Sequence, residues 1–359
     1  MRVAVTLPSD LGAMEKDEWR AMQAAAPQLH NPFLSAEFTL AVGRAREAAR
    51  VAVLEEGQQV VGFLPYELAG FGVGKAIGAG LSDCQGLICR PGCGWDPRAF
   101  LRGCGLAVWE FDHLVGSQLP LFCDRGVRWP SPVMDLVNGY EAYLEGRRLE
   151  SKKIVKTTFW KQRKMQREVG DIRFDFDCRD LGTLSALIRW KSAQYARMLE
   201  YDRFADPRTV EIVEDLFHTQ TAECAGTLSV MYAADRPVAA HFGLRSSTVL
   251  ACWFPAYDGA FAKYSPGLQL HFMMAEAAAA RGIRYLDLGK GHLEYKESLK
   301  SGDLEVAEGW ISRPHPTALV RRMQRAPHRH LAPLIKRHPT LHTKVRRAQW
   351  RLRQLRSAS

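Results

Sequence analysis

Residues 253–268 combine a strand, a polar loop and a helix start, an order that can bind a phosphorylated ligand. The helix is expected to begin at Ser265-Pro266-Gly267. Its first N–H groups lack partners within the helix and carry partial positive charge, so they suit a pyrophosphate. Ser265 is expected to cap the helix, Pro266 fits its first turn, and Gly267 lets a ligand approach the backbone. A purely structural helix start explains the same pattern equally well.

Residues 285–296 form a second polar segment, in which a short apolar strand ends in a loop with two glycines. Ligands collect at strand ends in α/β sheets. Asp287 lies inside this strand, where a carboxylate needs hydrogen-bond partners or loses its charge. It is therefore either a structural acceptor or a base. His241, in the apolar strand 238–244, is likewise either a core histidine or a proton acceptor that faces a cleft.

The segments around these clusters predict an α/β domain. Two helices come first, three antiparallel strands follow, and a helix stopped by Gly282 then leads to a further strand. The expected helices are 184–199, 206–225 and 266–281, and the expected strands are 228–233, 238–245, 249–254, 284–288 and 306–312.

The first half of the chain contains a similar pair of strands. Residues 50–55 and 59–68 are apolar, β-branched runs separated by a short turn, which predicts a hairpin. Their lengths resemble those of 228–233 and 238–245. The two halves are therefore expected to share one fold.

A long basic helix is expected to connect the halves over residues 139–170. Asn138 and Glu141 have the spacing of a capping box, and Gly170 closes the helix. Nine Lys or Arg and a single acid, Glu150, lie between Arg147 and Arg167. This face is either simply solvated or a surface for an anionic substrate, lipid or partner.

Length and charge bound the domain organisation. A chain of 359 residues favours two domains. Residues 313–359 contain 13 Lys or Arg and no acid, so the net charge of +10 leaves −3 for residues 1–312. The body therefore does not predict a nucleic-acid partner. The basic tail either contacts an anionic membrane surface or only aids solubility. The expected units are 1–138, 139–170, 171–312 and 313–359.

The eight cysteines form no Cys-x-x-Cys pair, and the cluster at positions 84, 89, 93 and 104 matches no common zinc spacing. Reduced thiols and no metal are expected. No run approaches the roughly 20 apolar residues that cross a bilayer, and the first residues lack the apolar stretch of a signal peptide. A cytoplasmic protein is expected, with the tail as its contact to the inner membrane surface if it has one.

Several short segments together form a recognisable set of motifs. In the second half they are Ala240-His241-Phe242-Gly243-Leu244-Arg245, Ala256-Tyr257-Asp258, Tyr264-Ser265-Pro266-Gly267, Arg281-Gly282, Asp287-Leu288-Gly289-Lys290-Gly291 and Tyr295-Lys296. In the first half they are residues 32–38, 62–65 and Leu81-Ser82-Asp83. With these segments, most of residues 30–312 resembles the CelD-like acetyltransferases linked to cellulose and other exopolysaccharide synthesis, which are relatives of the Fem peptidyltransferases. The implied fold is α/β, with tandem GNAT-like halves, each a mixed sheet flanked by helices, plus the basic C-terminal tail.

The resemblance implies acyl transfer from acyl-CoA, in particular acetyl-CoA, to an amine or hydroxyl of a sugar or glycan precursor. The common GNAT acyl-CoA signature is absent, and residues 263–268 occupy its place. The expected catalytic residues are His241, Asp287 and Tyr295. The expected donor-binding residues are Trp253, Phe254, Tyr264, Ser265, Pro266, Gly267 and Leu268, and the expected substrate-binding residues are Arg245, Tyr257, Asp258, Lys290 and Lys296.

The expected mechanism is direct attack on the thioester, without a covalent enzyme intermediate. Backbone N–H groups beside residues 253–255 and the helix start at Pro266 would hold the thioester and the oxyanion, and His241 or Asp287 would take the proton of the acceptor. Tyr295 would protonate the leaving thiolate and Lys296 would anchor an anion. Two alternatives stay open: an aminoacyltransferase that uses charged tRNA, and a non-catalytic scaffold of a polysaccharide assembly complex.

Overall fold

A computed structural model describes residues 1–122 and 126–321. Residues 322–359 lie outside the described ranges. They include most of the tail 313–359, which is the segment expected to contact a membrane. Within the described ranges, no helix is long and apolar enough to cross a bilayer.

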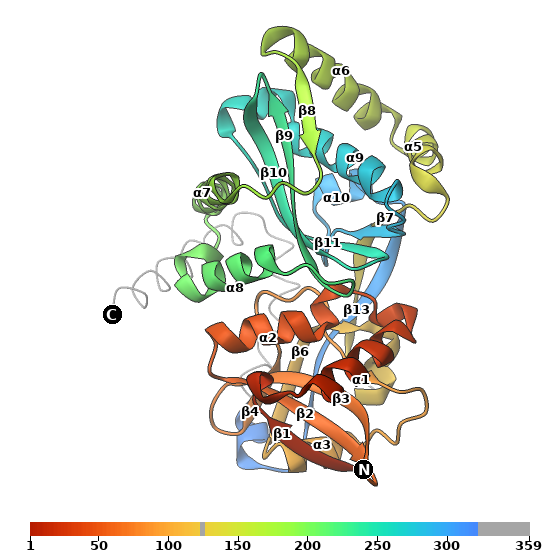
Figure 1. Cartoon of the computed structure of the whole chain (residues 1–359), viewed down its shortest axis with the longest axis vertical. Helices are drawn as coiled ribbons and strands as arrows, with labels where there is room; N and C mark the ends of the chain where they lie inside the picture. The colour runs from red at the N-terminus through yellow and green to blue at the C-terminus, as the bar shows by residue number, and fades with distance from the viewer. Residues whose placement is uncertain (123–125, 322–359) are drawn as a thin grey trace.

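One mixed sheet runs through the described part of the chain (Figure 1). Its strand order is β1-β2-β3-β4-β6-β13-β7-β12-β11-β10-β9-β8, with β5 beside β3. The strands are β1 (Arg2–Thr6), β2 (Ala49–Glu56), β3 (Gln59–Leu68), β4 (Val73–Ala76), β5 (Ile88–Cys89), β6 (Val108–Val115), β7 (Val127–Asp135), β8 (Ile172–Asp175), β9 (Ala225–Ala233), β10 (Arg236–Arg245), β11 (Val249–Tyr257), β12 (Tyr285–Asp287) and β13 (Gly302–Ser312).

Strand exchange joins the two halves of this sheet. The last strand, β13, pairs with β6 of the first half and with β7. β7 precedes the connecting helices in the sequence, yet it pairs with β12 of the second half. The two halves therefore share a continuous hydrogen-bonded ladder.

Each half repeats one arrangement of strands and helix. In the first half, the β2–β3 hairpin is followed by β4, a short helix α3 (Pro97–Gly103), and β6 parallel to β4. In the second half, the β9–β10 hairpin is followed by β11, helix α9 (Pro266–Ala279), and β12 parallel to β11. This repetition agrees with the expected common fold and with tandem GNAT-like halves.

Helices cover both faces of the second half-sheet (Figure 1). Ala240, Phe242 and Leu244 of β10 pack in the same core cluster as α7 (Leu181–Met198) and α8 (Pro207–His218). α9 packs in a second cluster against the other face. Side chains alternate between the faces along each strand, so neighbouring residues of β10 and β11 serve different cores. The remaining helices are α1 (Ala13–Ala24), α2 (Ala36–Ala45), α4 (Leu119–Phe122), α5 (Gly139–Glu150), α6 (Lys152–Glu168) and α10 (Glu294–Leu299).

The basic connector differs from the single helix expected over 139–170. It consists of α5 and α6, which meet at Ser151, a residue outside the helical region with φ −132° and ψ 39°. The expected capping box is also absent, because the side chain of Asn138 makes no capping hydrogen bond. The break lets α6 take its own direction across the outer side of α9.

Candidate active site

The pairing between β11 and β12 is short, and this opens the sheet beside β11. Only residues 249–251 of β11 pair with β12. Residues 252–257 continue without a β12 partner, and the start of α9 follows them. A gap in a sheet at this position brings the groups on its two faces close together. The strand expected over 249–254 is observed as β11, which continues to Tyr257 and so ends nearer to the start of α9.

A bulge at Trp253 uses the backbone donors that were expected to hold an oxyanion. The Trp253 N–H donates to His241 Nε2 at 3.1 Å, and Pro255 has no N–H to offer. Phe254 lies opposite Phe242 in the ladder with β10. The indole Nε1 of Trp253 donates to the Leu81 carbonyl at 3.0 Å, which anchors the first half to the second. Trp253 and Phe254 therefore serve the core.

His241 is fully buried and its Nε2 lone pair is occupied. Because Nε2 accepts the Trp253 N–H, the ring proton is on Nδ1, which has no partner among the described residues. Burial, followed by the nearby His271 and Lys191, holds the pKa of His241 well below its usual value. A Cβ on Gly243 would lie 2.5 Å from the ring, so this glycine lets the imidazole lie against the strand. The contacts give His241 the structural role.

His271, on α9, is the second buried imidazole of this region. Its Nδ1 donates to the Gly267 carbonyl at 2.7 Å, which leaves the Nε2 lone pair without a partner among the described residues. The ring lies 6.2 Å from that of His241 and 5.8 Å from that of Tyr295, between centroids. Burial lowers the pKa of His271, so the ring is neutral near pH 7.

Asp287 binds three donors that come from different parts of the chain. Its Oδ1 accepts Ser131 Oγ–H at 2.7 Å and Gly289 N–H at 2.9 Å, and its Oδ2 accepts Asn31 Nδ2 at 3.2 Å. Burial raises the pKa of this carboxyl, while the Gly289 and Ser131 hydrogen bonds oppose the rise. Asp287 therefore ties the first half and β7 to the end of β12, as a structural acceptor would.

Replacing Asp287 by alanine is expected to lower the free energy of unfolding by about 3–5 kcal/mol, because three donors lose their acceptor. Urea unfolding followed by circular dichroism measures this change. The matched control is Asp303→Ala, since Asp303 forms an ion pair with Lys300 on the surface and should cost about 0–1 kcal/mol. An Asp287→Ala protein as stable as the control, with lost turnover, would instead assign Asp287 to proton transfer.

Tyr295 and Lys296 lie at the start of α10, next to the end of β12. Lys296 is 7% exposed, and its Nζ donates to the carbonyls of Gly289 at 2.9 Å and Lys290 at 3.2 Å. Burial lowers the pKa of Lys296, and the negative charge of Asp83 is the largest effect that opposes this. Burial also raises the pKa of Tyr295, so its hydroxyl keeps its proton. This pair offers a buried cation and a phenol donor.

Lys191 approaches the open side of β11 from α7. Its Nζ donates to the Pro255 carbonyl at 3.1 Å and to Gln194 Oε1 at 3.2 Å. Burial lowers the pKa of this amine to about 8, with Arg203 as the next cause. The positive charge of Lys296 also lowers this pKa.

The start of α9 has the expected position but a different cap. Ser265 is in the left-handed region with φ 54°, and its hydroxyl makes no capping bond. It instead accepts a hydrogen bond from Lys161 Nζ of α6 at 2.7 Å. Gly267 and Leu268 are half-buried, so the first turn reaches solvent. Tyr264 is buried and donates its hydroxyl to Glu168 at 2.7 Å.

The remaining expected substrate-binding residues are spread apart. Tyr257 lies next to Gly267. Asp258 caps the turn that follows β11 and pairs with Arg236 at 2.8 Å on the surface. Lys290 donates to the Asp112 carbonyl of β6 at 2.6 Å. Arg245 lies opposite Leu250 at the end of the β10–β11 ladder, whereas Tyr257 lies opposite Ala239 at its other end. The structure thus places Tyr257 near the start of α9 and separates Arg245 from it.

A cavity of about 470 Å³ lies between the halves on the α7 side. Tyr195, one helical turn after Lys191, contributes to its wall, and Lys191 Nζ lies 5.2 Å from the Tyr195 ring centroid. This volume is within the range of small-molecule sites. The cavity is lined by Arg46, Ala79, Gly80, Leu81, Tyr195, Glu200, Tyr201, Arg203, Asp206 and Thr209.

Sequence reasoning missed three ionisable residues of this region. Asp83 belongs to a matched segment but received no role, and His271 lies in an apolar helix. Lys191 carried a readable signal, because Leu187 and Tyr195, four residues to either side, place it on the apolar face of the expected helix. A lysine on the apolar face of a helix is rarely fully buried without a partner or a function.

Comparisons with known proteins identify the domain that holds this site. Residues 154–297 match the family described as an acetyltransferase (GNAT) domain. No curated protein matches the chain. FemX is similar in structure, with a TM-score of 0.59 and 8% identity over 89% of this chain and 99% of that one.

Two further solved structures share the fold. A protein of unknown function from Bacteroides thetaiotaomicron has a TM-score of 0.54 and 11% identity, over 84% of this chain and 98% of that one. The C-terminal domain of a protein described as a lysylphosphatidylglycerol synthetase from Agrobacterium fabrum has a TM-score of 0.51 and 11% identity, over 87% and 97%. At these identities the likeness concerns the fold. Residues 154–297 form a GNAT acetyltransferase domain, whose general donor is an acyl-CoA, and the chain is an acyltransferase.

Proposed function

We propose that the protein transfers an acyl group from acyl-CoA, in particular acetyl-CoA, to an amine or hydroxyl of a sugar or glycan precursor in exopolysaccharide synthesis. The gap beside β11 carries this proposal. It has a helix start suited to phosphates at one end and Lys191, Lys296 and Tyr295 around it. Tyr195, in the wall of the cavity between the halves, lies beside Lys191, with 5.2 Å between the Lys191 Nζ and the ring centroid.

The donor is assigned to the start of α9. The half-buried first turn at Gly267 presents the positive end of the helix dipole, while the Leu268 N–H already donates to the Ser265 carbonyl at 3.2 Å. Lys161 adds a cation at Ser265. These groups fit a pyrophosphate, and the thioester would then extend along the unpaired part of β11.

The acceptor is assigned to the cavity between the halves. Its two tyrosines offer flat apolar surfaces, and Glu200, Arg203 and Thr209 offer hydrogen-bonding groups around them. A ring with many hydroxyl groups uses both kinds of contact. This combination supports a sugar acceptor.

Proton transfer is assigned to Lys191 rather than to His241 or Asp287, whose acceptor atoms have structural partners. The neutral amine of Lys191 donates two N–H groups to Pro255 and Gln194 and directs its lone pair at the acceptor. The acceptor nitrogen or oxygen bonds to the thioester carbon as its proton moves to Lys191. The C–S bond then breaks, and Tyr295 protonates the thiolate. Lys296 stabilises the negative charge on the carbonyl oxygen.

Binding and turnover of acyl-CoA test the function directly. Native mass spectrometry with a panel of acyl-CoAs is expected to show one bound donor, and free CoA is expected to accumulate when amino sugars are added. Consumption of aminoacyl-tRNA without acyl-CoA binding would favour the aminoacyltransferase alternative. Absence of both, with binding to a synthase complex, would favour the scaffold.

Lys161→Glu is expected to weaken acetyl-CoA binding by about 10-fold, because it places a negative charge beside the phosphates. Isothermal titration calorimetry measures the change in Kd. Lys156→Glu is the matched control, since Lys156 is on the same helix but exposed on its outer side. Equal affinities for all three proteins would move the phosphate site away from the start of α9.

A further inference from the structure

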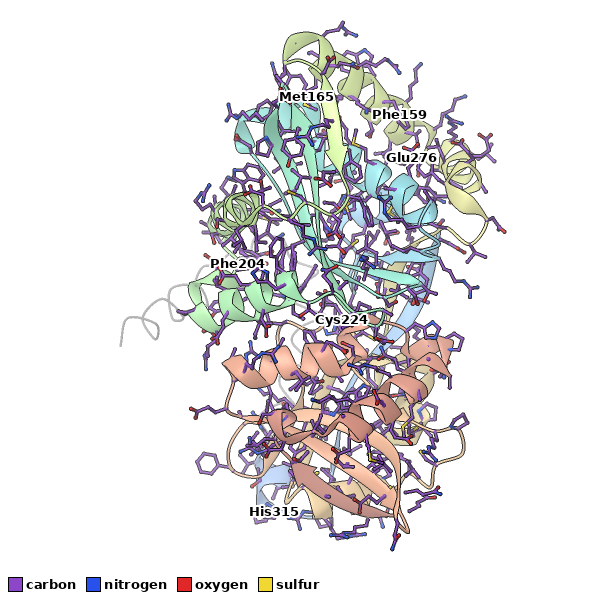
Figure 2. All side chains as sticks on the ribbon, viewed as in Figure 1. Phe159, Met165, Phe204, Cys224, Glu276 and His315 are labelled. Carbon is purple, nitrogen blue, oxygen red and sulfur yellow. The ribbon has the colours of Figure 1, made fainter. Side chains whose placement is uncertain are left out.

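Helix α6 has an inner face that packs on the protein and an outer face that does not. Phe159 packs against Phe272 of α9 with 5.6 Å between ring centroids and the rings tilted by 36°, and Val155 and Met165 are buried. Figure 2 shows the labelled Phe159 and Met165 on α6 at the upper end of the molecule. The packing of this helix is thus satisfied from one side, and the other side faces solvent.

The outer face of α6 carries five cations and one aromatic ring in a continuous stripe. At 3.6 residues per turn these six side chains fall within about 100° of the helix circumference. All six are exposed, and Trp160 has 49% of its surface accessible. The α6 stripe consists of Lys152, Lys153, Lys156, Trp160, Arg163 and Arg167.

The charge of the α6 stripe is not neutralised by the acids at the ends of the helix. Glu150 is paired with Arg147, and Glu168 is engaged by Lys164, Lys263 and Tyr264. Over residues 1–122 and 126–321, no carboxylate lies within ion-pair distance of the five cations of the stripe. Five like charges over the roughly 25 Å length of a 17-residue helix suit an extended anionic partner.

Two exposed apolar side chains favour a lipid surface over a nucleic acid as the partner of the α6 stripe. Trp160 is in the middle of the stripe, and Leu149, 78% exposed, is in the last turn of α5, three residues before the first lysine of the stripe. A large exposed aliphatic side chain gains nothing from phosphate contacts but gains free energy on entering a lipid interface. Trp is a preferred side chain at that depth. Lysines and arginines around such groups are attracted by anionic headgroups.

We propose that the α6 stripe, together with Leu149, docks the protein on the surface of an anionic phospholipid bilayer. The helix would lie in the plane of the surface, with Trp160 and Leu149 inserted and the five cations at headgroup level. Because Lys161 of the same helix contacts Ser265, docking would bring the start of α9 close to the membrane. The proposal is independent of the identity of the acceptor.

Sedimentation with vesicles of phosphatidylcholine containing about 30% phosphatidylglycerol, compared with phosphatidylcholine alone, tests the proposal on the full chain. Lys152→Glu/Lys156→Glu/Arg163→Glu is expected to lower the partition coefficient for anionic vesicles by at least about 10-fold, and Trp160→Ala by about 3-fold. The matched control reverses three exposed cations elsewhere, as Arg98→Glu/Arg189→Glu/Arg197→Glu, and should stay within about 2-fold.

Each outcome bears on the proposal. A selective loss in the stripe variant supports it, provided that the variant melts at the temperature of the wild type. Equal binding by the stripe variant and the wild type would overturn it and assign membrane contact to another part of the chain. Equal losses in stripe and control variants would overturn it as well, because only net charge would then matter. If the stripe variant keeps its vesicle binding but loses tRNA binding, the stripe binds RNA and the lipid proposal is wrong.

Discussion

Replacing Lys191 by arginine is expected to lower kcat/KM by about 10²–10⁴-fold, the range for loss of a positioned base. The reason is that arginine keeps the positive charge but cannot release its proton in a protein. Lys191→Met should lose as much, because it removes both the charge and the lone pair. The rate of CoA release from acetyl-CoA with an amino-sugar acceptor measures both variants.

The pH dependence separates a base from a cation at this position. The pKa of Lys191 is lowered to about 8, mainly by burial, so the amine is protonated below that pH and neutral above it. A base must be neutral, and kcat/KM should therefore rise with pH and level off above about 8. A required cation would give the opposite profile, with activity falling through the same pH.

Lys16→Arg is the control for Lys191→Arg, since Lys16 lies on α1, remote from the second half-sheet. It should leave the rate and its pH profile unchanged. An active Lys191→Arg enzyme with a flat profile would give the base to another group. His271 would be the next candidate, because its Nε2 accepts no hydrogen bond from residues 1–122 and 126–321.

Local patterns predicted the start of α9 and the strand of Asp287, because proline, glycine and apolar periodicity act over a few residues. The structure begins α9 at Pro266 and places Asp287 at the end of β12. Local patterns could not show that β13 returns to β6 or that β7 pairs with β12. Such pairings join segments far apart in the chain, and the alternation of apolar residues along one strand does not identify the strand with which it pairs.

The roles of individual polar atoms were also beyond the sequence. His241 and His271 are both buried, yet Nε2 is occupied in the first and, among the described residues, has no partner in the second. From the sequence, Asp287 is either a base or a hydrogen-bond acceptor. The structure shows that its carboxylate accepts hydrogen bonds from Asn31 and Ser131. A residue type in an apolar segment indicates that a polar group needs a partner. Which partner it finds depends on the tertiary fold.

Lys296 presents the second large expected effect, because its burial has no evident structural benefit. Taking an ammonium out of water costs several kcal/mol, and a methionine of similar length would fill the same space without that cost. The fold nevertheless satisfies two of its N–H groups with the carbonyls of Gly289 and Lys290, and Asp83 supplies a negative charge. Within the part of the chain that the structure describes, these two carbonyls are its hydrogen-bond acceptors, which leaves a third N–H of the ammonium for a ligand. Perturbed buried groups of this kind are concentrated at functional sites.

Lys296→Met is accordingly expected to lower kcat by about 10²–10³-fold, the usual effect of removing one donor to a developing oxyanion, with KM for acetyl-CoA within about 3-fold. Steady-state kinetics separates this from the other role open to Lys296, an anchor for donor phosphate, which would raise KM and leave kcat unchanged. Lys300→Met, at the end of the same helix, is the control, because Lys300 is held by the surface acids Glu297 and Asp303. A Lys296→Met protein with wild-type kcat and KM would mean that the buried charge serves only the Gly289 loop, and the oxyanion would then need another donor.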